Sequence, residues 1–211
     1  MLKLKHNYYL GEKAVKTMST SEFTKYMIAQ GVKQLLQTTD FEALSVGEIA
    51  RHCHISRNTF YYHFKDKYDI ISWIFYTEIT PIIGDSNRID NWGEGLLALC
   101  KYMQENKEFY IKVLQVQGQN SFSECLMDFY ANLVRNLLLK AKGDQVLDPR
   151  QIRITSNFYA FGLTGVVSNW AKSGMKADPE PVIRMLQDLL SGEIFDKILA
   201  LQNETQTEES Q

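Results

Sequence analysis

Two short amphipathic segments joined by a tight turn constrain the fold of this chain more than any other feature. In the first segment, 46–53, apolar side chains recur at i, i+3, i+4 and i+7, which places them on one face of a helix. Ser45 and Glu48 form a capping-box pattern where this helix would start. A second short helix is predicted over about 56–63, after the segment 52–55. The pair predicts a helix-turn-helix arrangement.

The rest of the chain carries many helix patterns and few strand patterns. It has only four prolines and no Asn-Gly or Asp-Gly pair, so β-hairpins are not indicated. A longer amphipathic helix, about 21–38, precedes the two short ones. Asp148-Pro149 and Asp178-Pro179 are helix starts, and Gly174 is a natural C-cap. The helices predicted after position 65 are 66–80, which stops at Pro81, then 92–105, 107–115, 121–142, 149–173 and 178–190. The predicted fold class is all-α.

Charge is distributed unevenly along the 211 residues, although the formal net charge is only -2. Residues 1–68 hold ten Lys and Arg against six Asp and Glu, a net charge of +4, so the remainder carries -6. A basic front part favours a polyanionic partner. Uneven scatter of solvated charge is the alternative, which only a binding motif can exclude.

The sequence lacks the patterns of a membrane protein, a secreted protein or a metalloprotein. It has no run of eighteen apolar residues, and lysines interrupt its first apolar patches, so the expected location is the cytoplasm. Cys53, Cys100 and Cys125 lie far apart in predicted helices, which favours reduced thiols. Zinc-ligand spacing is absent around Cys53, and its place on the apolar stripe argues against a Cys-His nucleophile. We expect no metal, no cofactor and no enzyme activity.

Packing of the three N-terminal helices would sort their side chains by polarity. The positions expected to face inward are Phe41, Leu44, Val46, Ile49, Ile55, Phe60 and Phe64. The polar side chains left outside on the third helix are Ser56, Arg57, Asn58, Thr59, Tyr62 and His63. The segment 57–59 falls in the first turn, where a recognition helix meets base edges. Arg matches guanine and Asn matches adenine, whereas hydroxyls, His and Lys can donate to phosphates.

The stretch FEALSVGEIARHCHISRNTFYYHFKDKYDII, residues 41–71, carries a longer motif. Its elements are Ile49-Ala50, Ile55-Ser56, the run Phe60-Tyr61-Tyr62-His63-Phe64 and Lys65-Asp66-Lys67. This pattern resembles the DNA-binding domain of the TetR/AcrR family of bacterial transcriptional regulators, over about residues 21–72. The resemblance implies a three-helix DNA-binding unit.

The resemblance also implies roles for individual residues. Ser45 and Val46 would meet the DNA backbone at the start of the second helix. Arg57, Asn58 and Thr59 would read or brace bases. The positions that would hold phosphates are Tyr61, Tyr62, His63 and Lys67. Two departures from the family pattern matter: Val46 replaces a frequent hydroxyl and should weaken one phosphate contact, whereas Asn58 replaces a frequent glycine and should add a base contact.

A second motif lies in NFYAFGLTGVVSNWAKSGMKADPEPVIRML, residues 157–186. Its matching elements are Phe158-Tyr159, Gly162, Gly165, Trp170, Ser173-Gly174 and Pro179. They are similar to the C-terminal domain of a TetR-family branch typified by the regulator of dihydroxyacetone kinase. The similarity implies an all-α domain for effector binding and dimerisation. The predicted organisation is a basic extension 1–20, a helix-turn-helix domain 21–68, a helical effector and dimerisation domain 69–202 and a disordered tail 203–211.

Two sites are predicted in the rear domain. Aromatic side chains would either line a ligand pocket or simply pack in the core, and the candidates are Trp73, Tyr76, Tyr102, Tyr110, Phe129 and Phe158. Small residues on the long helix 149–173 would allow a second copy to approach closely. The candidates for this dimer seam are Gly162, Gly165, Ser168 and Trp170.

The resulting hypothesis is a homodimeric transcriptional regulator that binds a palindromic double-stranded DNA operator. A small-molecule effector of unknown identity would act on a repressor by changing the separation of the two recognition helices, with the helix 66–80 as lever. The alternative is a co-regulator or activator without ligand, whose rear domain binds a partner protein. The lysines of the first sixteen residues would either enter the minor groove or have no function.

Overall fold

The computed structural model describes residues 18–83, 92–116, 118, 121–141 and 148–191, and within them every regular element is an α-helix. The predicted all-α class is confirmed. The predicted basic extension, apart from 18–20, and the predicted tail lie outside the described residues. None of the described helices is long and apolar enough to cross a membrane.

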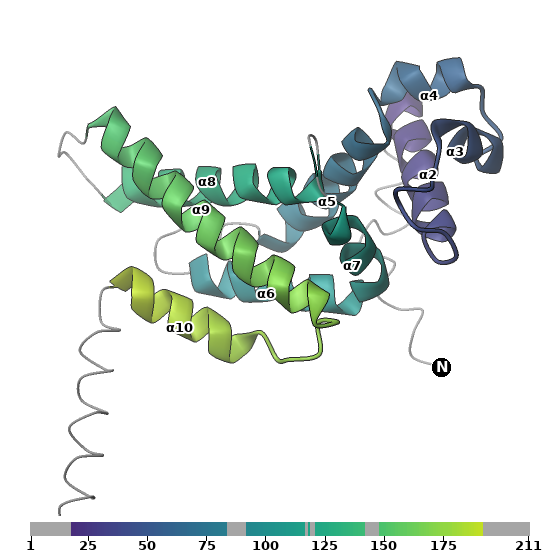
Figure 1. Cartoon of the computed structure of the whole chain (residues 1–211). Coiled ribbons are helices and arrows are strands. Elements are labelled where there is room, and N and C mark those ends of the chain that lie inside the picture. Colours follow the sequence, from purple (N-terminus) through teal and green to yellow (C-terminus); the bar gives the residue numbers. More distant parts are fainter. Residues whose placement is uncertain (1–17, 84–91, 117, 119–120, 142–147, 192–211) are drawn as a thin grey trace, which may run out of the picture.

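The N-terminal unit comprises α2 (Thr20–Leu35), α3 (Val46–His52) and α4 (Arg57–His63), gathered at one end of α5 (Lys67–Ile83), as Figure 1 shows. Each of the three helices starts at a serine whose hydroxyl accepts a backbone N–H three residues on. In α2 and α3 a glutamate completes a capping box. The two short helices therefore start and end within a residue of their predicted bounds.

The predicted inward positions of this unit are confirmed. Val46 and Ile55 are half-buried against the core. The remaining inward positions are at most 2% exposed: Phe41, Leu44, Ile49, Phe60 and Phe64. Because the apolar side of α4 is used in this core, Arg57, Asn58 and Tyr62 lie exposed at the surface, whereas Thr59 and His63 are half-buried.

The larger part of the molecule is a helical bundle. Its members after α5 are α6 (Trp92–Glu105), α7 (Lys107–Gln115), α8 (Phe122–Ala141), α9 (Pro149–Lys172) and α10 (Glu180–Ser191). α9 packs against α8 and α7, α5 against α6 and α8, and α10 against α6. The prediction that the fourth helix stops at Pro81 is wrong, because α5 continues to Ile83. Proline removes only one N–H donor, and near a helix end that loss interrupts little.

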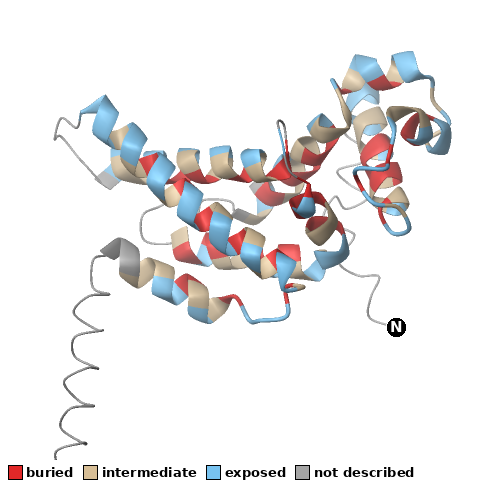
Figure 2. Cartoon of the chain, viewed as in Figure 1, coloured by how far each residue is buried: buried red, intermediate tan, exposed pale blue. Residues whose placement is uncertain are grey.

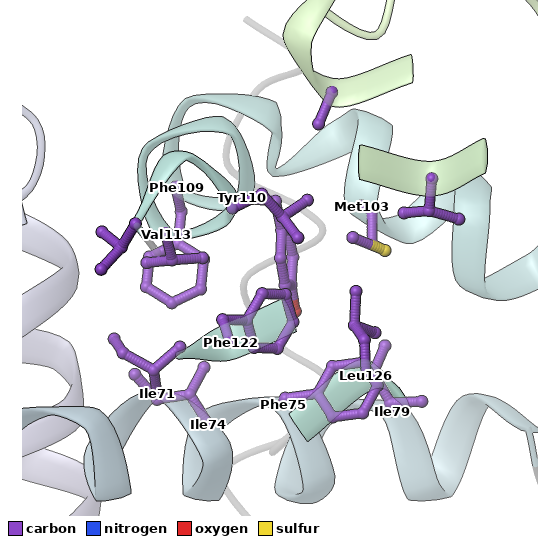
Figure 3. Close-up of a cluster of buried hydrophobic side chains, with 14 of the residues drawn as sticks. Ile71, Ile74, Phe75, Ile79, Met103, Phe109, Tyr110, Val113, Phe122 and Leu126 are labelled. Atoms are coloured by element: carbon purple, nitrogen blue, oxygen red, sulfur yellow. The ribbon is translucent and has the colours of Figure 1, made fainter. Parts of the chain in front are cut away.

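An apolar core joins α5 to the helices around it. Figure 3 shows Phe75 and Ile79 of α5 facing Tyr110 of α7 and Phe122 of α8. The ring centroids of Phe75 and Phe122 are 5.3 Å apart in edge-to-face geometry. Tyr110 is 0% exposed, and its hydroxyl has no hydrogen-bond partner, so burial raises the pKa of this group. α5 therefore belongs to the core of the bundle while its first turn adjoins the N-terminal unit.

Candidate nucleic-acid interface

The outward face of α4 gathers most of the predicted DNA-binding side chains. Tyr62 is 81% exposed and Tyr61 56%, and Arg57 and Asn58 are also exposed. In the described part of the chain, the Arg57 and Asn58 side chains make no hydrogen bond or ion pair. Their donors are free for an external partner, as base reading requires.

Two predicted residues at the start of α4 bond to each other, and a third, at its end, is half-buried without such a bond. The Ser56 hydroxyl accepts the Thr59 N–H at 2.9 Å and lies 2.8 Å from the Thr59 hydroxyl. Ser56 is thus the N-cap of α4, and Thr59 is half-buried beside it. His63 is also half-buried, and its Nδ1 has no hydrogen-bond partner, so any phosphate contact from this ring falls to Nε2.

The turn between α3 and α4 contains a residue in an unusual conformation. His54 has φ of 55°, the left-handed region that glycine adopts with least strain. Beside it, His52 Nε2 lies 3.0 Å from Gln34 Oε1 on α2. Cys53, predicted to be buried, is half-buried against Gly31 of α2, and burial raises the pKa of its thiol. A protonated thiol is a poor nucleophile. The described residues include no group of three side chains able to hold a metal ion.

At the start of α3, where Ser45 and Val46 are predicted to meet the DNA backbone, the side chains of Ser45 and Glu48 form a capping box. Ser45 Oγ donates to Glu48 Oε2 at 2.6 Å and accepts the Glu48 N–H at 3.2 Å. These side-chain and backbone hydrogen bonds from Ser45 hold the pKa of Glu48 below its usual value. Val46 packs against the core, so this position offers no polar group to a phosphate, as predicted from its lost hydroxyl.

Lys67 is the predicted phosphate ligand whose position contradicts its role. Its ammonium donates to the backbone carbonyls of Phe41, Glu42 and Leu44 at 2.8, 2.8 and 2.9 Å. It also lies 4.9 Å from the centre of the Phe41 ring. Burial of the ammonium lowers its pKa despite the nearby carboxylates of Glu42 and Glu48. All three donors are used inside the molecule, so Lys67 fastens the loop before α3 to α5 instead of gripping a phosphate.

A second exposed surface lies on α9. Figure 2 shows this helix with buried residues on one side and a continuous exposed side facing away from the bundle. Three large apolar side chains on that side are 64–72% exposed: Ile154, Phe158 and Phe161. A Cβ added at Gly162 or Gly165 would meet nothing within 4 Å. We call this surface, 154–166, the α9 apolar face.

The predicted dimer residues divide between this face and the interior. Gly162 and Gly165 lie on the α9 apolar face, and Ser168 is half-buried. Trp170 does not lie on it: its indole N–H donates to the Ala177 carbonyl at 3.0 Å. Its ring lines an apolar cavity of about 40 Å³ between α6, α9 and α10. Ile154 and Phe161 were missed by the prediction, although their spacing marks a second apolar stripe beside the inward one.

Most of the side chains predicted to line a ligand pocket pack against other aromatic rings. The prediction is wrong for Phe158, which is 72% exposed on α9. Phe129 contacts the rings of Phe75 and Tyr76, with centroids 5.2 and 6.4 Å away. The Tyr102 and Tyr110 rings are likewise in contact, 6.1 Å apart. None of the predicted pocket residues lines the small apolar cavity or the larger groove of about 540 Å³ between α2 and the α6–α7 corner.

Polar contacts connect the N-terminal unit to the bundle beside that groove. Lys33 of α2 forms an ion pair with Glu78 of α5, whose other carboxylate oxygen accepts the Tyr102 hydroxyl of α6. The side chains of Lys33 and Glu78 are only 16% and 21% exposed. Lys112 of α7 donates to the Thr39 carbonyl at 3.1 Å. Burial raises the pKa of the Tyr102 hydroxyl, which therefore acts as a donor.

Family models match two separate parts of the chain. A family model described as bacterial regulatory proteins, tetR family, matches residues 30–72, and one described as transcriptional regulator C-terminal region matches residues 90–192. The HTH-type dhaKLM operon transcriptional activator DhaS of Lactococcus lactis subsp. lactis (strain IL1403) is 30% identical over 121 residues. That alignment spans 57% of this chain and 64% of the relative.

Solved structures share the fold. A dihydroxyacetone kinase operon activator DhaS has a TM-score of 0.59 at 23% identity, over 82% of this chain and 97% of that one. The fatty acid degradation regulator FadR from Bacillus halodurans has a TM-score of 0.53 at 22% identity, over 79% and 94%. NalD, the secondary repressor of the MexAB-OprM efflux pump in Pseudomonas aeruginosa, has a TM-score of 0.51 at 16% identity, over 82% and 97%.

Proposed function

Because the chain belongs to the TetR family of bacterial transcriptional regulators, which are not enzymes, we propose that it acts as a homodimer on a palindromic DNA operator in the cytoplasm. The observation that carries the DNA-binding part is the outward face of α4. It presents Arg57 and Asn58 without intramolecular partners in its first turn, flanked by two exposed tyrosines. Arg and Asn supply base discrimination, and the tyrosine hydroxyls supply phosphate contacts.

The α9 apolar face supports the homodimer. Contiguous apolar surface is rarely left in water, and a face of the same chemistry on a second copy would cover it. The two glycines in this face would let the helices approach closely. A two-fold dimer would place two copies of α4 in successive major grooves, which is the geometry that a palindromic operator requires.

Two observations favour an activator with a protein partner over a repressor with a small-molecule effector. The Lactococcus relative is named as an operon activator. In addition, the aromatic side chains predicted to line a pocket are packed against one another. We therefore propose activation with a partner protein at the rear domain, and repression controlled by a small apolar effector is the alternative to test.

Selection from a random duplex pool with the purified chain would test the operator. We expect two inverted half-sites with centres one helical turn, about 10 base pairs, or a multiple of it apart. Failure to enrich any sequence would refute sequence-specific binding. Transcription in vitro from a promoter carrying the selected site, with and without the chain, would then give the sign of regulation.

A further inference from the structure

The first turn of α3 contains a glycine that lies against a predicted base-reading side chain. A Cβ placed on Gly47 would lie 2.5 Å from Nη2 of Arg57 and 3.2 Å from its Cζ and Nε. All three atoms belong to the planar guanidinium, so this group, rather than its aliphatic stem, contacts Gly47. A side chain at position 47 and the observed position of the guanidinium exclude each other.

Nothing else in α3 calls for glycine at this position. Gly47 is helical and does not have the positive φ that favours glycine. Glycine also has a lower helix propensity than alanine, so it weakens this short helix. The nearest atoms to an added Cβ all belong to Arg57, the far end of a flexible side chain. A Cβ would therefore displace the guanidinium without disturbing the packing of α3.

The missing side chain at Gly47 leaves room for the Arg57 guanidinium to lie against α3. The Arg57 side chain is exposed and makes no hydrogen bond or ion pair within the described residues. Its five N–H donors have no partner among the described residues, and the guanidinium lies beside the first turn of α3. A guanidinium oriented in advance loses less conformational freedom when it forms two parallel hydrogen bonds to one base.

We propose that Gly47 is a specificity-determining residue, which positions Arg57 for bidentate recognition of a guanine. The inference rests on the proposed function, in which Arg57 reads a base. Displacement of the guanidinium would remove the geometry of the two hydrogen bonds and keep the positive charge. Gly47 therefore controls discrimination between bases and not the general attraction to DNA.

Equilibrium binding of four proteins tests this inference: the native chain, Arg57→Ala, Gly47→Ala and the double variant. Each is measured on the selected operator, on operators with single base-pair replacements and on scrambled DNA. Arg57→Ala first identifies the base pair that Arg57 reads. Gly47→Ala should lose about 10-fold in discrimination at that same base pair. Its affinity for scrambled DNA should be unchanged, and its thermal midpoint should be equal or higher.

The double variant separates the possible explanations. Discrimination no worse than that of Arg57→Ala supports the inference, because both changes then remove the same contact. Three results would each overturn the inference. The double variant could lose discrimination beyond Arg57→Ala by as much as Gly47→Ala loses alone. Gly47→Ala could keep full discrimination, or its thermal midpoint could be lower than that of the native chain. Should Arg57→Ala alter no base preference at all, base reading by Arg57 in the proposed function fails first, and the Gly47 inference falls with it.

Discussion

Two helices of this molecule expose a pair of aromatic side chains, and the pairs differ in a single functional group. Tyr61 and Tyr62 of α4 are 56% and 81% exposed, and Phe158 and Phe161 of α9 are 72% and 64% exposed. The tyrosines carry hydroxyls that can donate to an anion. The phenylalanines carry none, and they gain free energy only when another apolar surface covers them.

The residues around each pair have the same chemical character as the pair: polar and basic around the tyrosines, and apolar around the phenylalanines. Arg57 and Lys65 flank the tyrosines, whereas Ile154 and two glycines flank the phenylalanines. Exposure alone therefore does not identify what a surface binds. The chemistry around the rings supports the proposal that the face of α4 binds DNA and that the α9 apolar face binds a second copy of the chain.

The largest effect is expected from a charge on the α9 apolar face. Phe161→Glu should weaken the dimer about 100-fold or more, because it removes a large apolar contact and places a charge in the interface. Sedimentation equilibrium at micromolar concentration would measure this. Tyr62→Glu on α4 is the matched control, and it should abolish DNA binding while the dimer persists. A Phe161→Glu protein that stays dimeric would remove the distinction between the two pairs.

The next largest effect is expected at Glu78, where α2 of the N-terminal unit meets the bundle. Glu78→Ala should lower the free energy of unfolding by about 3 kcal/mol, because Lys33 and Tyr102 lose their shared partner in a partly buried site. Denaturant unfolding followed by circular dichroism is the measurement. Glu180→Ala removes the exposed Arg184–Glu180 pair and serves as the control, with a loss of about 0.5 kcal/mol or less. Equal losses in both variants would contradict a structural role for the Lys33–Glu78 pair.

Replacement of Lys67 tests whether this residue contacts DNA or only stabilises the fold. Lys67→Met should lower the free energy of unfolding by about 2 kcal/mol, because three backbone carbonyls lose a charged donor. The salt dependence of DNA binding should be unchanged, since this ammonium contacts no phosphate. Binding across a salt series distinguishes the two roles. A shallower slope, by roughly one counterion per subunit, would restore the phosphate role that the sequence predicts.

Exchanging the hydroxyls between the two pairs should give a smaller effect. Tyr62→Phe should weaken binding to operator and scrambled DNA alike by about 1 kcal/mol, because a phosphate contact carries no base information. Phe158→Tyr should weaken the dimer by a similar amount, about 1 kcal/mol, if the added hydroxyl is buried without a partner. If Tyr62→Phe lowers affinity for the operator but not for scrambled DNA, then the Tyr62 hydroxyl contacts a base and not a phosphate.

The smallest effect concerns the capping box at the start of α3, beside the face of α4. The folded-state pKa of Glu48 is lowered from 4.5, so its contribution to stability is present above pH 4.5 and is lost as pH falls through the folded pKa. Glu48→Gln should therefore flatten the fall in thermal midpoint below about pH 5. An unchanged profile would mean that other carboxylates, such as Glu22, dominate acid unfolding.

The N-terminal unit was predictable because local patterns specify it. Serine caps and the apolar period determine where α3 and α4 begin, and the buried rings of Phe60 and Phe64 follow from that period. The partner of Lys67 was not predictable. Its carbonyl acceptors belong to a loop that only the tertiary packing brings to the start of α5.

The bundle was predictable in its helices and less so in their faces. α6 and α7 start and end where the pattern places them. α9, however, carries apolar residues on two sides, and periodicity cannot say which side meets α8 and which meets solvent. The same ambiguity explains why Phe158 and Trp170 exchanged their expected surroundings. The role of Gly47 was not predictable because the sequence does not show that the Arg57 side chain, ten residues later, lies against this glycine.

Among the described residues, polar contacts hold the N-terminal unit to the bundle at three places, in addition to ring contacts such as Phe41–Tyr68 and Phe64–Trp73. Two are on α5, at Lys67 and at Glu78, about 16 Å apart along the helix. The third is Lys112 on α7. A rigid body supported at three points that do not lie on one line can neither slide nor spin freely, and it tilts when one support moves. A displacement of α7 relative to α5 would thus appear as a rotation of α4. In a two-fold dimer each copy would rotate in the symmetry-related sense, so the spacing between the two α4 helices would change by twice the displacement of one.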